Sequence, residues 1–195
     1  MQKYFEEDIR SMNITGWSAA ENDLAESFAQ AAQCLIDALR RKNRVLVCGN
    51  GGSAADAEHL AGELVGRFGY DRASLPGISL CTPSATFTAI ANDYGYDQVF
   101  KRQTQGLGSA GDVLIGISTS GNSANIVEAF AAAKTMQITT IALTGCRDSK
   151  LSKIADITLR SPSTQTPRIQ EIHGLLVHSL CRAVEEEMFP VNGRA

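Results

Sequence analysis

The stretch Arg44–Glu63, RVLVCGNGGSAADAEHLAGE, joins a short apolar segment to a glycine-rich turn and then to a helix-like pattern. Its first five residues, RVLVC, predict a buried strand. Gly51 and Gly52 leave room for an anion close to the backbone, where N–H groups at the start of the helix and the helix dipole favour negative charge. The order of strand, glycine turn and helix predicts an α/β fold with an anion site.

Two chemically active side chains follow this turn. His59 and Glu63 stand four positions apart, so a helix places the imidazole and the carboxylate on the same face. Taken alone, such a pair indicates an ordinary exposed helix face. Beside a phosphate-binding turn, the pair indicates metal binding or acid–base chemistry, and the combination favours phosphosugar chemistry.

Outward from this stretch, apolar segments of strand length alternate with amphipathic segments of helix length. The predicted strands are Arg44–Cys48, Gly77–Cys81, Asp112–Ser118, Ile138–Thr144 and Asp156–Arg160. The helices expected between them are Ala54–Arg67, Thr86–Gly106, Ser123–Met136 and Ser149–Ile154. This alternation predicts an α/β fold in which helices cover both faces of a five-stranded parallel sheet.

The length of 195 residues predicts a single domain, residues 1–195. We expect two N-terminal helices within residues 1–42, the second from Glu21 to about Lys42, to serve packing or oligomerisation. The α/β core and a C-terminal helix then occupy residues 43–195. That last helix is expected to begin at Thr166-Pro167, a suitable N-cap and first-turn proline, and to end near Met188. The acidic triplet Glu185–Glu187 predicts a solvated helix face.

Composition limits the possible functions. A net charge of −3 argues against a general nucleic-acid binder, which needs clustered lysine and arginine. No apolar stretch approaches the roughly 20 residues of a membrane span, and the charged N-terminus is unlike a secretory signal. The five cysteines form no C-x-x-C pair and indicate small core residues in a reducing compartment. We therefore expect a cytoplasmic protein without a nucleic-acid or membrane partner.

A second glycine-containing turn, GISTSGNSANI (Gly116–Ile126), also joins a strand to a helix. Its hydroxyl groups come from Ser118, Thr119, Ser120 and Ser123. One alternative is that these residues only cap the helix and shape the turn. Four hydroxyls in six residues exceed what a cap needs, so the turn predicts an anion site.

Both turns follow strands, and ligands of open α/β sheets bind beyond the carboxyl ends of the strands. The two turns are therefore expected to share one ligand. Asn92 and Asp93, in ANDYGYD after the second strand, form a polar pair suited to sugar hydroxyls. From that segment alone, an Asn-Asp turn before a helix is the preferred interpretation.

Together, Cys48–Glu63, Asn92–Asp93, GDVLIGISTSGNSANI and the late segment RIQEIHGLLVH resemble the phosphoheptose isomerases of the sugar-isomerase (SIS) domain class. The resemblance runs from the second helix to near the C-terminus. It implies a Rossmann-like parallel sheet, a homotetramer with active sites where subunits meet, and a small sugar phosphate as substrate. The implied reaction converts sedoheptulose 7-phosphate to D-glycero-D-manno-heptose 7-phosphate, which enters heptose precursors for lipopolysaccharide core or other surface glycans.

The resemblance also implies roles for individual positions. It assigns contacts with the sugar to Asn50, Gly51, Gly52, Ser53, Glu63, Asn92, Asp93 and Gln170. It assigns contacts with the phosphate to Ser118, Thr119, Ser120 and Ser123. It implies that one zinc ion per subunit is bound by His59, Glu63, Gln170 and His178. It also implies that Glu63 and His178 are the proton-transfer pair. Some members carry an acidic residue just before RIQE, where this chain has Thr166-Pro167-Arg168.

Two of the implied roles are in tension with simple chemistry. An imidazole of His178 that binds zinc through one nitrogen has no free lone pair there for proton transfer. Gln170 and His178 lie about 12 Å apart along an unbroken helix and about 80° apart around it, so joint ligation needs long reaches or an irregular first turn. His173 lies outside the ligand pattern and is interpreted as structural, and Tyr94 and Tyr96 as packing residues.

Two alternatives belong to other functional classes. Non-catalytic relatives form tetramers that bind the bacterial replication initiator, but they lack the full set of acid–base and metal residues, which this chain retains. An amino-sugar phosphate domain shares the serine-rich turn, yet this chain has no glutaminase-sized region to supply nitrogen.

Overall fold

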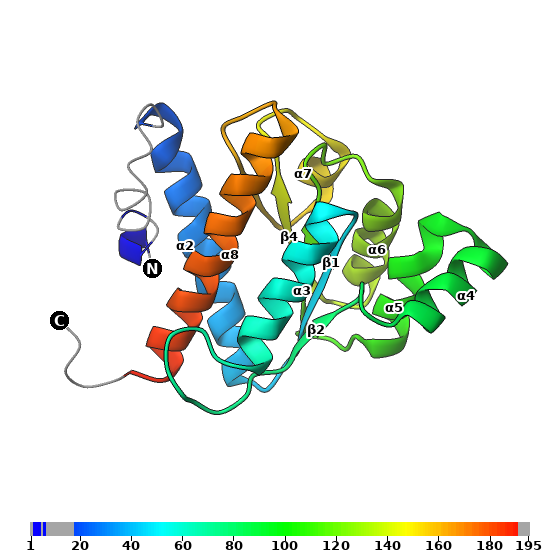
Figure 1. Ribbon diagram of the computed structural model, residues 1–195, viewed down its shortest axis with the longest axis horizontal. Helices are drawn as coiled ribbons and strands as arrows, with labels where there is room; N and C mark the ends of the chain where they lie inside the picture. The colour runs from blue at the N-terminus through cyan, green and yellow to red at the C-terminus, as the bar shows by residue number, and fades with distance from the viewer. Residues whose placement is uncertain (1, 5, 7–17, 191–195) are drawn as a thin grey trace.

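The computed structural model describes residues 2–4, 6 and 18–190 (Figure 1). Its helices are α2 (Ser18–Arg40), α3 (Gly52–Val65), α4 (Ser84–Tyr94), α5 (Val99–Leu107), α6 (Ala124–Thr135), α7 (Lys150–Ile154) and α8 (Thr166–Met188), with a 3-10 helix η1 (Tyr96–Gln98). Its strands are β1 (Val45–Gly49), β2 (Gly77–Ser79), β3 (Val113–Ile117), β4 (Thr139–Thr144) and β5 (Ile157–Arg160). Most of the first N-terminal helix that the sequence predicts falls outside the described residues.

The five strands form one parallel sheet in the order β2-β1-β3-β4-β5, which confirms the predicted fold class. Because the chain order reverses direction between β1 and β3, the turns after these two strands lead to helices on opposite faces of the sheet. In the register of this pair Gly49 lies opposite Ile117, so the two strands end side by side. The glycine-rich and serine-rich turns therefore begin next to each other.

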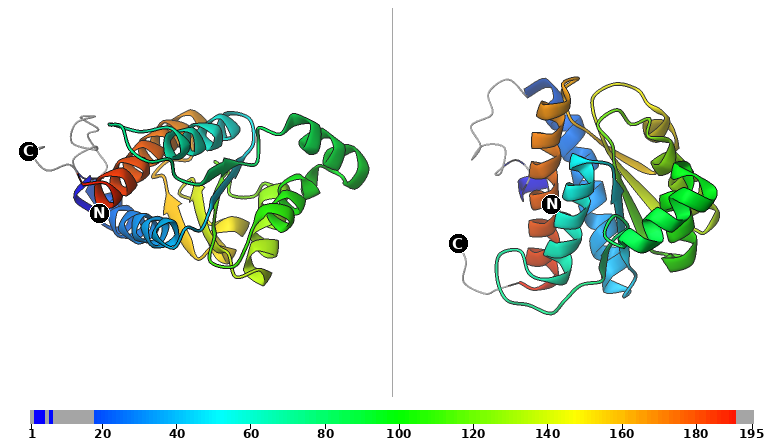
Figure 2. Two further views of the ribbon diagram at one scale, coloured as in Figure 1. Left: turned by 90° about the horizontal axis from the view of Figure 1, so that it is seen from below. Right: turned by 45° about the vertical axis from the view of Figure 1, so that its right-hand side comes forward.

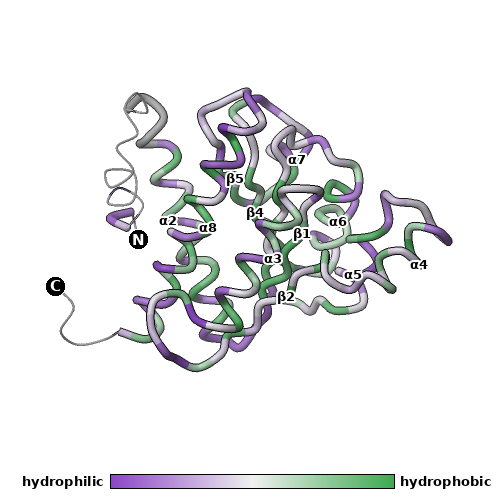
Figure 3. Tube along the Cα trace, in the orientation of Figure 1, coloured by the Kyte–Doolittle hydropathy of each residue, from purple (hydrophilic) through white to green (hydrophobic). Residues whose placement is uncertain are grey.

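Helices cover both faces of the sheet (Figures 1 and 2). On one face α2, α8 and α3 lie side by side, and Phe28 and Leu176 are buried there. On the other face α5, α6 and α7 bury Phe100 and Phe130. Hydrophobic and hydrophilic residues alternate along α2 and α8, as expected for helices with one buried face (Figure 3). Among the described helices, none combines the length and the apolarity that a membrane span requires.

The prediction of one continuous helix over Thr86–Gly106 is wrong. Gly95, with φ of 92°, interrupts it, so that α4, η1 and α5 replace a single helix. Helix α4 buries none of its residues and projects from the body of the protein (Figures 1 and 2). Asn92 and Asp93 consequently lie in the last turn of α4 rather than in a turn at a strand end.

Two smaller expectations for the last helix need correction. Helix α8 begins at Thr166 as predicted, but Gln165 occupies its N-cap position and Pro167 lies in its first turn. The acidic triplet is not wholly solvated, because Glu185 is only 1% exposed and faces the interior. Its buried carboxylate has partners that the sequence pattern did not indicate.

Candidate active site

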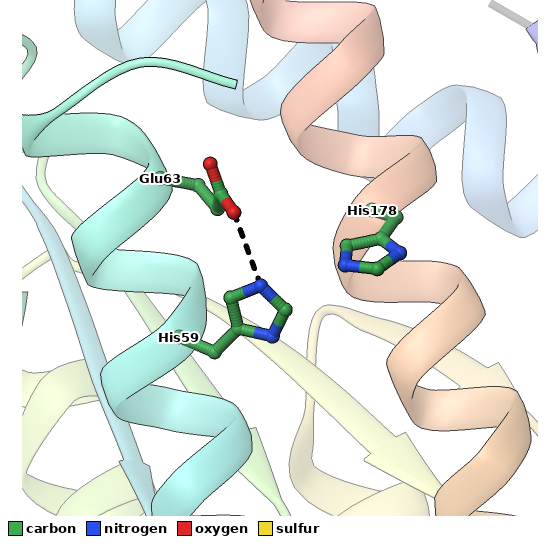
Figure 4. A group of neighbouring side chains, drawn as sticks. All are labelled: His59, Glu63 and His178. Carbon is green, nitrogen blue, oxygen red and sulfur yellow. Dashed lines mark hydrogen bonds and ion pairs between the residues drawn. The ribbon is translucent and has the colours of Figure 1, made fainter. Parts of the chain in front are cut away.

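Helices α3 and α8 bring three of the predicted site residues together (Figure 4). His59 and Glu63 come from α3, and His178 comes from α8. The His59 Nε2 and Glu63 Oε1 atoms are 3.1 Å apart, and the imidazoles of His59 and His178 meet edge to face with ring centroids 4.9 Å apart. The potential ligand atoms of the three residues lie within 4.8 Å of one another.

This cluster, which we call the His/Glu cluster (His59, Glu63 and His178), suits a divalent cation. Two imidazoles and a carboxylate are a donor set that zinc accepts, and an open position would remain for water or substrate. Glu63 is half-buried, whereas His59 and His178 are exposed. The cluster therefore opens to the surface of the chain, where a ligand can reach it.

Gln170 lies in the second turn of α8, and its side chain contacts the start of α3. A Cβ atom at Gly52 would collide with the Gln170 Nε2 atom, so the side chain lies directly over the glycine turn. Because α8 is helical from Thr166 onward, Gln170 and His178 occupy positions about two turns apart. The contact with Gly52 fits the substrate-binding role predicted for Gln170, and its role as a metal ligand stays a prediction.

The glycine turn is connected directly to the helix that follows the serine-rich turn. Gly51 adopts φ of 59°, a left-handed conformation that favours glycine, and α3 begins at the next residue. Asn50 exchanges two side-chain hydrogen bonds with Asn125 in the first turn of α6, at 3.0 and 2.9 Å. Tyr96 Oη donates a third, 2.9 Å long, to Asn50 Oδ1. These bonds connect the two turns directly, and their sharing of one ligand stays a prediction.

Asn125 and Tyr96 are residues that the sequence reasoning missed. Asn125 is buried, and its Oδ1 atom also accepts the backbone N–H of Ile126, so its side chain joins both turns. It lies inside the GISTSGNSANI motif, so the sequence pattern that indicates the serine-rich turn also includes Asn125. The prediction of a packing role for Tyr96 omits its hydrogen bond to Asn50, which it reaches because helix α4 ends at Gly95.

The serine-rich turn presents hydroxyls that are not used to cap a helix. Ser123 occupies the N-cap position of α6 without a side-chain capping bond, and its Oγ lies 2.9 Å from Ser118 Oγ. Ser120 Oγ accepts the backbone N–H of Asn122 at 3.1 Å. Ser118 and Ser120 therefore shape the turn, Ser123 does not cap α6 through its side chain, and the anion site stays a prediction. A pocket of about 230 Å³ beside the turn is lined by Thr119, Ser120, Asn122, Gly145, Cys146, Arg147, Asp148, Ser163, Thr164, Thr166 and Ile169.

Known proteins are similar to this chain in sequence and in fold. A family model described as SIS domain matches residues 11–145. A phosphoheptose isomerase of Sulfurimonas denitrificans is 47% identical over 190 residues, which cover 97% of each chain. The chain belongs to the phosphoheptose isomerase family of SIS domain proteins.

Solved structures of this family have the same fold. A phosphoheptose isomerase from Neisseria gonorrhoeae is 43% identical, with a TM-score of 0.81 over 94% of this chain and 96% of that one. One from Francisella tularensis is 38% identical, with a TM-score of 0.83 over 94% and 95% of the two chains. The likeness extends across nearly the whole chain, so the family assignment covers the glycine turn, the serine-rich turn and the His/Glu cluster together.

Asn92 and Asp93 occupy a different part of this SIS domain. Both are exposed near the end of α4, and Asn92 Nδ2 donates a 2.8 Å hydrogen bond to Asp93 Oδ1. Within the same segment, Tyr96 contacts the glycine turn through Asn50. The sugar-binding role of Asn92 and Asp93 stays a prediction from the family resemblance.

His173 is the third histidine of this phosphoheptose isomerase family member, and it is fully buried beneath the strand ends. Its Nε2 atom lies 3.3 Å from the carbonyl oxygen of Thr144, and its Nδ1 atom has no hydrogen-bond partner. Burial lowers the pKa of His173 to about 4, although the bond to Thr144 opposes the shift. The imidazole is therefore neutral at pH 7, and Nε2 carries the proton that it donates to Thr144.

Proposed function

We propose that this chain is an aldose–ketose isomerase that converts sedoheptulose 7-phosphate to D-glycero-D-manno-heptose 7-phosphate. The observation that carries this proposal is the His/Glu cluster, where His59, Glu63 and His178 meet in a fold that also presents the Ser118–Ser123 turn. The names of the relatives supply the substrate class, since sequences 44–49% identical to this one are named phosphoheptose isomerase. They favour the isomerase over the initiator-binding alternative.

In the proposed reaction Glu63 acts as the base. Its carboxylate takes the proton from C1 of the ketose while the C2 carbonyl oxygen gains a proton, which gives an enediol. Loss of the O1 proton and return of a proton to C2 then complete the aldose. Glu63 is half-buried and hydrogen-bonded to His59, and this contact orients its carboxylate within the His/Glu cluster.

His59, Glu63 and His178 would hold a zinc ion. When bound, zinc supplies Lewis-acid polarisation of the carbonyl and hydroxyl oxygens of the sugar. His178 would serve as ligand or as proton donor at a given moment, because one imidazole nitrogen cannot do both at once. Gln170 completes the predicted ligand set from its position over the glycine turn.

The rest of the substrate would be bound between the two turns. Ser118, Thr119, Ser120 and Ser123 would receive the 7-phosphate, since hydroxyls and helix-start N–H groups bind phosphate well. Asn50, Gly51, Gly52, Ser53 and Gln170 would line the sugar, with Asn92 and Asp93 contributing from α4. The hydrogen bonds between Asn50 and Asn125 support a single ligand spanning both turns.

The proposed quaternary and cellular context rests on the family resemblance. The proposed assembly of this single domain is a homotetramer with active sites at subunit interfaces, in the cytoplasm, supplying a heptose precursor for surface glycans. Two features support an assembly: α4 buries no residue within its own chain, and Tyr94 and Tyr96 are 57% and 51% exposed. Light scattering of the purified protein tests the tetramer.

A coupled assay tests the proposed reaction. Purified protein loaded with zinc is given sedoheptulose 7-phosphate, and formation of the aldose is followed by NMR with and without a chelator. We expect conversion that the chelator abolishes and added zinc restores. Absence of conversion with zinc present would reject the proposal, and preferential binding of glucosamine 6-phosphate would favour the amino-sugar alternative.

A further inference from the structure

The segment that follows α3, residues 66–76, is held by a buried ion pair. The Arg72 Nε and Glu185 Oε1 atoms lie 3.2 Å apart, and the two side chains are only 3% and 2% exposed. Arg72 belongs to the segment itself, whereas Glu185 lies near the end of α8. A pair this deeply buried needs several further hydrogen bonds to offset the loss of hydration.

Arg72 makes those further bonds to the end of α3. Its Nη2 donates to the carbonyl oxygen of Glu63 at 2.6 Å, and its Nη1 donates to those of Leu64 and Gly66 at 2.7 and 3.2 Å. The last carbonyls of a helix have no partner within the helix, and a cation there is favourable. The guanidinium therefore fixes the backbone of Glu63, the proposed base.

Glu185 holds the backbone of the segment 66–76. Its Oε1 accepts the backbone N–H of Phe68 at 2.8 Å, and its Oε2 accepts that of Gly69 at 2.5 Å. These bonds hold the Phe68 backbone where its ring packs against the imidazole of His178, with ring centroids 5.8 Å apart. Glu185 itself follows His178 by about two helical turns on the same face of α8.

We propose that Arg72, Glu185 and Phe68 are positioning residues for the isomerisation. Arg72 holds the backbone of Glu63 by a hydrogen bond to the Glu63 carbonyl oxygen. Phe68 supports His178 because the two rings are in contact. The Arg72–Glu185 ion pair connects these two contacts. The three residues thereby set the spacing between the two members of the proton-transfer pair. This inference rests on the proposed function, which assigns proton transfer to Glu63 and His178.

Substitutions at Phe68 and Arg72 test the proposal. Phe68→Ala removes the ring from His178 but leaves the ion pair, and we expect kcat to fall about tenfold with KM changed less than twofold. Phe68→Tyr retains the ring and is expected to restore kcat. Arg72→Lys retains the charge but cannot reach Glu185 and the three carbonyls together, so kcat and zinc affinity are both expected to fall about tenfold.

The matched control is Arg182→Lys, on α8 one turn before Glu185. Arg182 pairs with Glu186 at 3.0 Å, so this change replaces the same residue type without touching the Arg72–Glu185 pair. We expect wild-type kcat and zinc affinity for it. Each variant is measured at a temperature well below its unfolding midpoint and at known zinc content.

Two results would overturn the positioning role: Phe68→Ala with wild-type kcat, or recovery in Phe68→Tyr no better than in Phe68→Ala. If Arg72→Lys fails to fold, the Phe68 variants decide the question alone. Failure of the wild-type protein to isomerise sedoheptulose 7-phosphate rejects the proposed function instead. In that case the zinc affinity of Arg72→Lys, measured without substrate, still tests whether Arg72 sets the spacing between Glu63 and His178.

Discussion

The imidazole of His178 meets that of His59 edge to face, with ring centroids 4.9 Å apart and ring planes at 86°. One ring comes from α8 and the other from α3, so the contact joins two helices that are distant in sequence. Because Glu63 lies beside His59 on α3, the three groups converge on one point. This point is where the proposed zinc ion would be bound.

Zinc binding should depend on both helices. We expect His59→Gln and His178→Gln each to weaken zinc binding at least tenfold, because each removes one imidazole from the donor set. His173→Gln is the control, since His173 is buried elsewhere and bonded to Thr144. Competition titration with a zinc-binding dye measures the affinities. Wild-type affinity in both cluster variants would show that zinc binds at another position.

The Tyr96 hydroxyl should contribute to substrate binding through Asn50. Tyr96→Phe removes the 2.9 Å hydrogen bond to Asn50 Oδ1 and keeps the ring. A net value of about 0.5–1.5 kcal/mol for such a bond predicts a roughly two- to tenfold rise in KM. Tyr94→Phe is the matched control, because the Tyr94 ring lies against Arg102 and its hydroxyl is not part of this network. Steady-state kinetics that show equal KM values for the two variants would contradict the role.

A side chain at Gly52 should displace Gln170, because the Gln170 amide occupies that space. In Gly52→Ala the new methyl group would push the Gln170 amide away from the glycine turn. We expect kcat/KM to fall by about tenfold while the fold is retained. Gly106→Ala in α5 is the control, since a Cβ there meets no atom within 4 Å. If Gly52→Ala has wild-type kinetics, Gln170 takes no part in binding.

Burial of His173 should make stability depend on pH. Its pKa is lowered from 6.5 to about 4, so between these values the unfolded chain binds a proton that the folded chain does not. The free energy of unfolding should therefore fall as the pH drops from 6.5 to 4, by up to roughly 1.4 kcal/mol per unit from this group. Urea denaturation across this range should show a shallower fall for His173→Gln, and identical slopes would contradict it.

The sequence predicted the sheet and the two turns that follow β1 and β3 because each of these features is local. The run RVLVC is apolar enough for a buried strand, and Gly51 and Gly52 mark the turn that follows it. Parallel strands also place their carboxyl ends at one edge, so the meeting of the two turns followed from the order of elements.

Other features depended on contacts between distant residues. Tyr96 reaches Asn50 because Gly95 ends α4, and the hydrophobic pattern of Thr86–Gly106 continues across that break. Glu185 looks like its neighbours Glu186 and Glu187 in the sequence, and its burial follows from Arg72, which is far away along the chain. Periodicity cannot reveal such partners, since it records the face of a helix and not what that face contacts.

The rate of Glu63→Gln is the most direct test of the proposed reaction. Glutamine keeps the size and polarity of Glu63 but cannot accept the C1 proton, and loss of a general base costs about 10²–10⁴ in rate. Wild type and variant are compared at equal zinc content, with sedoheptulose 7-phosphate as substrate and NMR detection of the aldose. We expect a kcat at least a hundredfold lower in the variant. An unchanged kcat would contradict the proposed reaction, because Glu63 would then not be the base.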